Sequence, residues 1–228
     1  MHHAHRAAGA TLADHHAWHL PSVYASLEAD LELLQHSGGI CDISHYGKLD
    51  LQGDHALGLL TSTLSLPAPL RVGSSQRAVL PTGDGATIDG LTALGLSYDE
   101  ALLLTPPSQV QAATEALQPR LDGCAHLVDQ TSSLSGVLVA GPLSRRFLSR
   151  LVELDLDPSV FPNGACAQCK AAEVHLFIFR NDLGGLPAFQ IYVTRDFGEY
   201  LWDALLHAAT PDGVRPVGLD SINHLNGA

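Results

Sequence analysis

The sequence predicts an α+β fold made of two similar halves, and two observations carry this prediction. Over residues 38–57 a glycine pair, two short alternating runs and the opening of a helix follow one another. About ninety residues later, 136–156 repeats the order of 47–66, which is a glycine, a short strand, a second glycine and a Leu-rich helix. We therefore expect a duplicated unit of two strands, a helix, two strands and a helix; two unrelated α+β halves are the alternative.

The first unit shows its strands by alternation. Residues 40–46 point in turn to the two faces of an extended chain, and residues 48–52 alternate again after a bend at Gly47. Asp54 then places negative charge at the N-terminus of a helix whose apolar stripe begins at Ala56. This pattern predicts two strands followed by a helix.

The later part of each unit follows one plan, in which two strands joined by a glycine-containing turn lead into a helix. The expected strand pairs span 86–104 and 172–193, and the expected helices span 110–117 and 200–208. If the halves are duplicates, Gly47 should superpose on Gly136 and Gly53 on Gly141.

We expect a single domain over residues 1–228. It would consist of halves at about 38–122 and 123–210, preceded by an N-terminal helical arm at 1–37. The boundary between the halves is predicted at Asp122-Gly-Cys124.

The N-terminal arm holds six of the thirteen histidines, at positions 2, 3, 5, 15, 16 and 19. A metal site is one interpretation. The favoured one is a frayed terminus over the first residues, because His15 and His16 point in different directions on any regular element. A helix is predicted over 23–35, with Ser22 as its N-cap and Glu28, Asp30 and Glu32 on its outer face.

Composition excludes some classes of partner. The formal net charge is −12 with only 12 Lys and Arg residues, which argues against nucleic acid or an anionic membrane surface. The first residues lack the apolar core of a signal peptide, and no apolar run of about 18 residues occurs, so we expect a cytoplasmic protein. The four cysteines are then expected to be reduced thiols.

Two charged side chains are candidates for ligand binding. Asp89 lies in the otherwise apolar and β-branched strand 86–94, either as an edge-strand charge facing solvent or as an acid that binds or protonates a ligand. We predict that it faces a concave pocket between the halves, because an unused acid there would be destabilising. Arg180 ends an apolar strand and could bind a carboxylate or pair with Asp182 or Asp196.

A CxxC pair is the other candidate. Cys166 and Cys169 precede Lys170, which would lower a thiol pKa. A zinc site needs four ligands, and Cys41 and Cys124 could complete one only if the fold brings them close. Structural thiols are favoured over a redox or metal role, and no metal is assigned.

Six short segments, taken together, resemble one family. They are Trp18-x2-Pro21-x2-Tyr24, Gly39–Gly53, Gly83–Leu91, Val128–Thr131, Ala140–Pro142 and Pro216–Leu219. In sequence and order they resemble the aminomethyltransferase (T-protein) of the glycine cleavage system over nearly the whole chain. Relatives of that fold include the small subunit of heterotetrameric sarcosine oxidase and a folate-dependent iron–sulfur maintenance protein.

This resemblance implies a duplicated, intertwined folate-binding domain that lacks the C-terminal barrel domain of longer relatives. It implies tetrahydrofolate as the cofactor, bound by Ser44, His45, Tyr46, Asp89 and Arg180. Asp89 is also the catalytic candidate, because in aminomethyltransferases an acid in the strand after the glycine turn approaches the pterin or the one-carbon nitrogen of tetrahydrofolate.

The chain departs from the family pattern at three positions. Gly90 replaces a second acid after Asp89, Thr105 stands at the place of a strand-closing asparagine, and Leu186 replaces the glutamate that pairs with the pterin ring. Loss of such a charge-assisted pair typically costs about 2–4 kcal/mol, or roughly 30- to 1000-fold in affinity.

We therefore expect a tetrahydrofolate-binding, aminomethyltransferase-like protein of one-carbon metabolism, as a subunit of a larger demethylating or oxidase complex. The alternative is a non-catalytic subunit or adaptor that kept the fold and lost folate binding, so enzyme activity is left open. The expected partners are folate or a small one-carbon donor and a protein partner chain. An apolar patch around 214–225 is expected to contact that chain.

Overall fold

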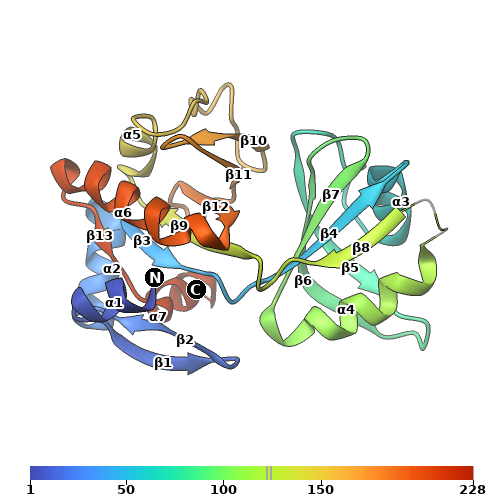
Figure 1. Cartoon of the computed structure of the whole chain (residues 1–228), viewed down its shortest axis with the longest axis horizontal. Helices are drawn as coiled ribbons and strands as arrows, with labels where there is room; N and C mark the ends of the chain where they lie inside the picture. Colours follow the sequence, from blue (N-terminus) through green and yellow to red (C-terminus); the bar gives the residue numbers. More distant parts are fainter. Residues whose placement is uncertain (122, 124, 228) are drawn as a thin grey trace. The chain divides into compact units, whose positions relative to one another are not determined.

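The structure is a computed structural model that describes residues 1–121, 123 and 125–227 (Figure 1). The chain divides into two compact units. Unit 1 comprises Met1–Ser44, Leu134–Asn163 and the chain from Gln168 onward, and unit 2 comprises His45–Ser133 and Gly164–Ala167. The predicted boundary residues Asp122 and Cys124 lie outside the described residues, and the single domain with halves at about 38–122 and 123–210 stays a prediction.

Unit 1 contains a β-hairpin, a mixed sheet and five helices within its described residues. The hairpin is β1 (Thr11–His15) with β2 (Trp18–Val23). The strands of the sheet, in spatial order, are β10 (Cys166–Ala171), β11 (Val174–Arg180), β12 (Ala188–Thr194), β9 (Leu134–Ala140), β3 (Gly39–Asp42) and β13 (Arg215–Pro216). The helices are α1 (His2–Ala7), α2 (Leu27–His36), α5 (Ser144–Leu148), α6 (Gly198–Ala209) and α7 (Leu219–Gly227), with 3-10 turns η3 (Arg195–Phe197) and η4 (Thr210–Asp212).

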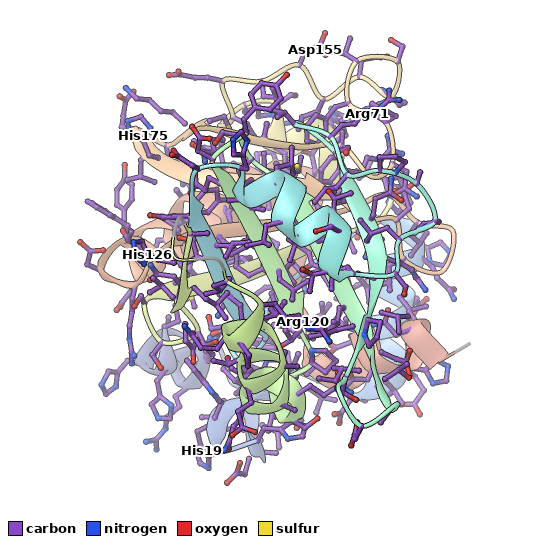
Figure 2. All side chains as sticks on the ribbon, turned by 90° about the vertical axis from the view of Figure 1, so that its right-hand side faces the viewer. His19, Arg71, Arg120, His126, Asp155 and His175 are labelled. Carbon is purple, nitrogen blue, oxygen red and sulfur yellow. The ribbon has the colours of Figure 1, made fainter. Side chains whose placement is uncertain are left out.

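Unit 2 is an antiparallel sheet covered by helices on one face. Its strands, in spatial order, are β5 (Ser75–Pro81), β6 (Thr87–Gly95), β7 (Glu100–Thr105), β4 (Gly47–Gly53) and β8 (Ala125–Asp129). Its helices are α3 (Ala56–Thr63) and α4 (Val110–Leu117), with 3-10 turns η1 (Pro107–Gln109) and η2 (Gln118–Arg120). Leu49 and Leu51 of β4 share one buried core with both helices, which lie over the sheet in Figure 2. Arg120, labelled there, donates to the Thr63 carbonyl at the end of α3 and to the Pro81 carbonyl of β5.

The two sheets repeat one strand order. The series β5-β6-β7-β4-β8 in unit 2 corresponds to β10-β11-β12-β9-β3 in unit 1, and α3 and α4 follow the same strands as α5 and α6. One strand is exchanged between the repeats, because β3 precedes β4 but pairs with β9, and β8 precedes β9 but pairs with β4. The fold is therefore the duplicated, intertwined α+β fold that the sequence predicted.

The strand register corrects one predicted match between the repeats. Gly47 pairs with Thr105 near the end of β7, and Ser135 pairs with Val193 near the end of β12. Thr105 and Val193 are equivalent, because each lies two residues before the 3-10 turn that leads into α4 or α6. Gly47 therefore matches Ser135, and its predicted match with Gly136 is wrong by one residue, which places Gly136 on the other face of its strand.

The predicted match of Gly53 with Gly141 agrees with this register. Gly53 ends β4, Gly141 directly follows β9, and each leads toward a helix. Their φ angles are +130° and +115°, in the region that favours glycine. Both turns therefore need a residue without a Cβ atom.

The N-terminal arm is not wholly helical. Trp18–Val23 forms a strand of a hairpin, which agrees with the preference of the residue before Pro21 for extended backbone. The predicted helix begins later, at Leu27, and Ser26 rather than Ser22 is its N-cap. The Ser26 Oγ accepts a hydrogen bond from the Ala29 N–H at 3.2 Å.

Asp30 was expected on the outer face of this helix but is buried. Its carboxylate accepts a hydrogen bond from the Gly218 N–H at 2.8 Å, directly before α7. Burial raises the pKa of Asp30. The apolar stripe of α2 gave no sign of this contact, because it comes from a segment 188 residues away.

The uncovered apolar patch expected around 214–225 is not present. Val214, Val217, Leu219 and Ile222 are buried, and Pro216 and Leu225 are partly buried. Helix α7 packs against α2 and β2 within unit 1. The partner chain expected from the sequence therefore has no such patch to bind.

We expect two helical glycines to respond oppositely to alanine. A Cβ at Gly198, in the first turn of α6, would lie 2.9 Å from the Ser135 Cβ, whereas a Cβ at Gly58 in α3 would meet nothing within 4 Å. Gly58→Ala should therefore raise the free energy of unfolding by up to about 1 kcal/mol, and Gly198→Ala should lower it by about 1–3 kcal/mol. Urea unfolding of both variants checks this, and an equal response would contradict the assigned packing of α6 on β9.

Candidate functional site

A buried polar network holds the N-terminus against the strand that leads to the candidate site. His5 is 1% exposed; its Nε2 lies 2.9 Å from Asp42 Oδ2, and its Nδ1 lies 2.8 Å from the Tyr24 hydroxyl. The ring also packs edge-on against Trp202 of α6, with centroids 4.7 Å apart. The predicted frayed terminus is therefore wrong at His5, and a single histidine in a polar segment carries no sequence signal for such a contact.

Asp42, which is held by His5, in turn binds the backbone of Ser44. The Asp42 Oδ1 accepts a hydrogen bond from the Ser44 N–H at 2.9 Å. The Ser44 Oγ accepts another from the Gly136 N–H of β9 at 3.1 Å. Ser44 is thus fixed at the point where the chain leaves β3.

His45 and Tyr46 follow at once, in unit 2. Their rings lie 4.7 Å apart with an interplanar angle of 31°. His45 is buried and Tyr46 is partly buried. The segment Ser44–Tyr46 is therefore an ordered crossover between β3 and β4.

Asp89 sits in a β-bulge and not on an edge strand. Strand β6 lies between β5 and β7, and the register with β5 shifts so that Asp89 and Gly90 face Val79 alone. Gly90 has φ +75°, and a Cβ there would lie 3.3 Å from the Pro106 Cγ. The bulge turns Asp89 outward, where it is exposed and accepts a weak hydrogen bond from the Thr87 hydroxyl at 3.4 Å.

Arg180 is held by a carboxylate within unit 1. Its Nε and one terminal nitrogen donate to the two oxygens of Asp182, both at 2.9 Å, and the other terminal nitrogen donates to the Phe161 carbonyl at 3.1 Å. Of the alternatives left open by the sequence, pairing with Asp182 is the one found. A guanidinium has five N–H groups, so two of them are not used by these contacts.

Leu186 closes a tight turn between β11 and β12. It exchanges two backbone hydrogen bonds with Leu183, each 2.9 Å long, around Gly184 and Gly185. The apolar side chain offers no acceptor to a pterin ring. This position therefore does not supply the contact that the family glutamate makes.

The CxxC cysteines do not form a reactive pair. Cys166 belongs to unit 2, where its thiol donates to the Ser74 and Gly95 carbonyls at 3.3 and 3.5 Å. Burial raises the pKa of Cys166 to about 12, and burial together with Glu153 raises that of Cys169 to about 11. The expected activation by Lys170 is therefore absent, because a raised pKa disfavours the thiolate. Within the described residues no three or more His, Cys, Asp or Glu side chains are grouped to hold a metal ion.

Asp50 is a further buried acid, beside Asp30 and Asp42, that no pattern in the sequence indicates. Asp50 lies in β4 and is 6% exposed, and burial first and Glu100 second raise its pKa to about 6. The alternation of residues 48–52 shows that Lys48, Asp50 and Gln52 share a face. It does not show that this face is covered at Asp50.

The five candidate site residues belong to three different segments of the chain. Ser44–Tyr46 lie in the crossover, Asp89 in the bulge of β6, and Arg180 at the end of β11. Ser44 and Arg180 belong to unit 1, and the other three belong to unit 2. Their assembly into one folate site stays a prediction.

The repeated strand order and the exchanged strands define a class of duplicated, intertwined α+β domains. A family model described as the GCVT N-terminal domain matches residues 1–226, and the chain belongs to this family. The aminomethyltransferase of Streptomyces avermitilis is 30% identical over 217 residues, which are 94% of this chain and 58% of that protein. The aminomethyltransferase of Anoxybacillus flavithermus is 26% identical over 92% of this chain and 58% of its own length. The chain thus spans somewhat over half of these relatives.

Two solved structures share the fold. The glycine cleavage system aminomethyltransferase T of Bartonella henselae superposes with a TM-score of 0.83 at 21% identity, covering 98% of this chain and 60% of that one. A chain of the heterotetrameric sarcosine oxidase of Corynebacterium sp. U-96 superposes with a TM-score of 0.64 at 18% identity, covering 81% of this chain and 91% of that one. The resemblance read from the sequence motifs is confirmed. No helix in the described part of the chain is long and apolar enough to cross a membrane.

The His5 network predicts a specific loss of stability. His5→Ala leaves the buried Asp42 carboxylate without its histidine partner, so the free energy of unfolding should fall by about 2–4 kcal/mol. His3→Ala, at an exposed position of the same helix, is the control and should change it by less than about 0.5 kcal/mol. Chemical unfolding at neutral pH measures the free energy of unfolding of both variants. An equally small change for His5→Ala and His3→Ala would show that the network does not stabilise the fold.

Asp50 predicts a pH dependence of stability. Its pKa is about 6 in the folded chain and lies near the ordinary value of 3.8 when unfolded, so the folded state holds this proton more strongly. The contribution of Asp50 therefore becomes less favourable as pH rises from about 4 to 6, by up to about 3 kcal/mol. Asp50→Asn removes this change, so the stability of the variant relative to the parent should rise over that range. Urea unfolding at four pH values measures it, and a difference independent of pH would refute the assignment.

Proposed function

We propose that the chain is a tetrahydrofolate-binding, aminomethyltransferase-like protein of one-carbon metabolism that acts as a subunit of a larger demethylating or oxidase complex. The family match over residues 1–226 carries this proposal. The similarity to a chain of heterotetrameric sarcosine oxidase, 91% of which is covered, supports a role beside partner chains. A cytoplasmic location is part of the same proposal.

The proposed contacts to tetrahydrofolate are hydrogen bonds and an ion pair. The exposed Asp89 carboxylate can accept a hydrogen bond from an N–H of the ligand near the reacting nitrogen. Arg180 can bind the carboxylate tail through the N–H groups that Asp182 and Phe161 do not use. Ser44, His45 and Tyr46 would contact the ligand from the ordered crossover.

A non-catalytic role is the second candidate, and three observations favour it. Leu186 offers no acceptor to the pterin ring, Gly90 supplies no second acid, and Arg180 already has a carboxylate partner. A chain that kept the fold and lost the ligand would show the same pattern. Enzyme activity is therefore not claimed.

Titration calorimetry with tetrahydrofolate separates these candidates. The parent chain alone is expected to bind at millimolar strength or weaker, because two polar contacts of the family are missing. Leu186→Glu restores one acceptor and should tighten binding by about 30-fold or more if the remaining site is intact. Leu186→Gln is the matched control, since it has similar size but no charge.

The affinities of the parent, Leu186→Glu and Leu186→Gln chains for tetrahydrofolate distinguish the two candidate functions. Tighter binding by Leu186→Glu than by Leu186→Gln supports the folate site, and no binding by any of the three chains supports the adaptor role. Micromolar binding by the parent chain would refute the need for a partner and favour an enzyme. Circular dichroism of each variant checks that the overall secondary structure is retained.

A further inference from the structure

Unit 2 contains a cavity that the proposed folate site does not use. Its volume is about 410 Å³, and all the residues that line it belong to unit 2. One wall is helix α3, which lies over the sheet in Figure 2. Sites for small molecules typically measure about 300–1,000 Å³. The cavity is therefore large enough for a free compound.

Apolar and aromatic side chains form the base and the edge of this cavity. The buried Leu57 and Leu70 form the base, and the edge carries the exposed rings of His55 and Tyr98. Tyr98 is 77% exposed, and its carbonyl accepts a hydrogen bond from the Leu57 N–H at 3.3 Å, which ties the turn between β6 and β7 to α3. An exposed ring beside an apolar base gains contact area when a flat molecule binds there.

Gly58 leaves the α3 wall of the cavity without a side chain. Its φ is not positive, and a Cβ there would meet nothing within 4 Å, so neither the backbone conformation nor the packing requires a glycine. Glycine is nonetheless among the least favourable residues in a helix. A residue that lowers stability without a structural reason is typical of a functional site. Here its effect is to keep the cavity open to a flat molecule.

Two hydroxyl groups give the same wall its polar character. Thr61 and Ser62 lie three and four residues after Gly58, and so share its face of the helix. Thr61 donates to the Leu57 carbonyl at 2.7 Å, and Ser62 donates to the Leu59 carbonyl at 2.9 Å. Because a hydroxyl has one hydrogen, both groups can offer only lone pairs to a ligand. The ligand must therefore bring the donor.

Charged ligands fit this cavity poorly. None of the described residues that line it is Asp, Glu, Lys or Arg. A carboxylate, phosphate or ammonium group would lose its hydration there without gaining a fixed partner of opposite charge. The lining therefore favours an uncharged compound.

We propose that this cavity binds a small, uncharged, planar aromatic compound that carries an N–H or O–H donor at its edge. The ring would lie against Gly58, over the apolar base, with Tyr98 at its side. The donor would point to the Thr61 hydroxyl oxygen. The site goes beyond folate binding and does not depend on it, because none of these residues is a proposed folate contact.

The test is an NMR titration of the full chain with benzimidazole and benzoxazole at about pH 8, where both probes are uncharged. The two bicyclic rings have the same shape, but benzoxazole has an oxygen in place of the N–H donor. We expect benzimidazole to shift the methyl signals of Leu57, Thr61 and Leu70, with a dissociation constant of about 1 mM for so small a ligand. Benzoxazole should bind about three- to tenfold more weakly.

Two variants test the shape of the site. Gly58→Leu places a side chain in the cavity and should weaken benzimidazole binding at least tenfold. Because leucine favours a helix more than glycine does, the free energy of unfolding should not fall, which separates loss of binding from loss of the fold. Tyr98→Ala should weaken binding about threefold or more. Tyr200→Ala is the matched control, since Tyr200 is a 51% exposed tyrosine of unit 1, and it should bind like the parent.

A third variant tests the hydrogen bond. Thr61→Val keeps the shape of the side chain but removes the acceptor. It should weaken benzimidazole binding about three- to tenfold and leave benzoxazole binding unchanged. An equal effect of Thr61→Val on both probes would refute the assigned donor contact.

Four further results would overturn the proposal. They are equal binding of benzimidazole by Gly58→Leu and the parent, equal binding of the two probes by the parent, absence of any shift at about 10 mM benzimidazole, and tighter binding of N-acetyltryptophan amide, which would assign the cavity to a protein side chain. Gly58→Leu should bind tetrahydrofolate as the parent does. Failure of this proposal is therefore distinguishable from failure of the folate proposal.

Discussion

The exchange of one strand between the repeats is the constraint on which the rest of the structure depends. β4 and β9 are central strands only because each receives a neighbour from the other repeat, β8 and β3 respectively. A central strand has its backbone donors and acceptors satisfied on both sides, which an edge strand does not. The chain must therefore cross between sheets twice, and the segment Ser44–Tyr46 is ordered because it forms one of these crossings.

Buried polar groups support this arrangement by joining distant parts of the chain. Asp42 of β3 receives His5 from the N-terminal helix, and Asp30 of α2 receives the Gly218 N–H beside α7. In each case the carboxylate has a partner that offsets part of the cost of burial. Asp50 differs, since one of its oxygens has no donor in the described residues.

Much of the fold could be read from the sequence because strands, turns and helices have local signals. The alternation of side chains over residues 48–52 located β4. The recurrence of the glycine, strand, glycine and helix order at 136–156 indicated the duplication. The errors arose where the deciding contact was not local. A stripe on α2 could not show that Asp30 meets Gly218, and β propensity in 86–94 could not show that Asp89 lies in a bulge of an inner strand. The site residues followed from family motifs, whereas Asp50 has no motif and is recognised only through its burial.

The exchanged strands also determine when the protein can fold during synthesis. β4 lacks its second neighbour until β8 at Ala125–Asp129 has emerged, and β3 must wait for β9 at Leu134–Ala140. Until then the growing chain displays open strand edges, which are prone to association with other chains. The sheet of unit 2 is completed when β8 has emerged. The sheet of unit 1 gains its first strand pair at β9 and is completed only after β10, β11, β12 and β13 have been made. The topology therefore leaves β9 and β3 each with one open edge until β12 and β13, among the last strands of the chain, have been made.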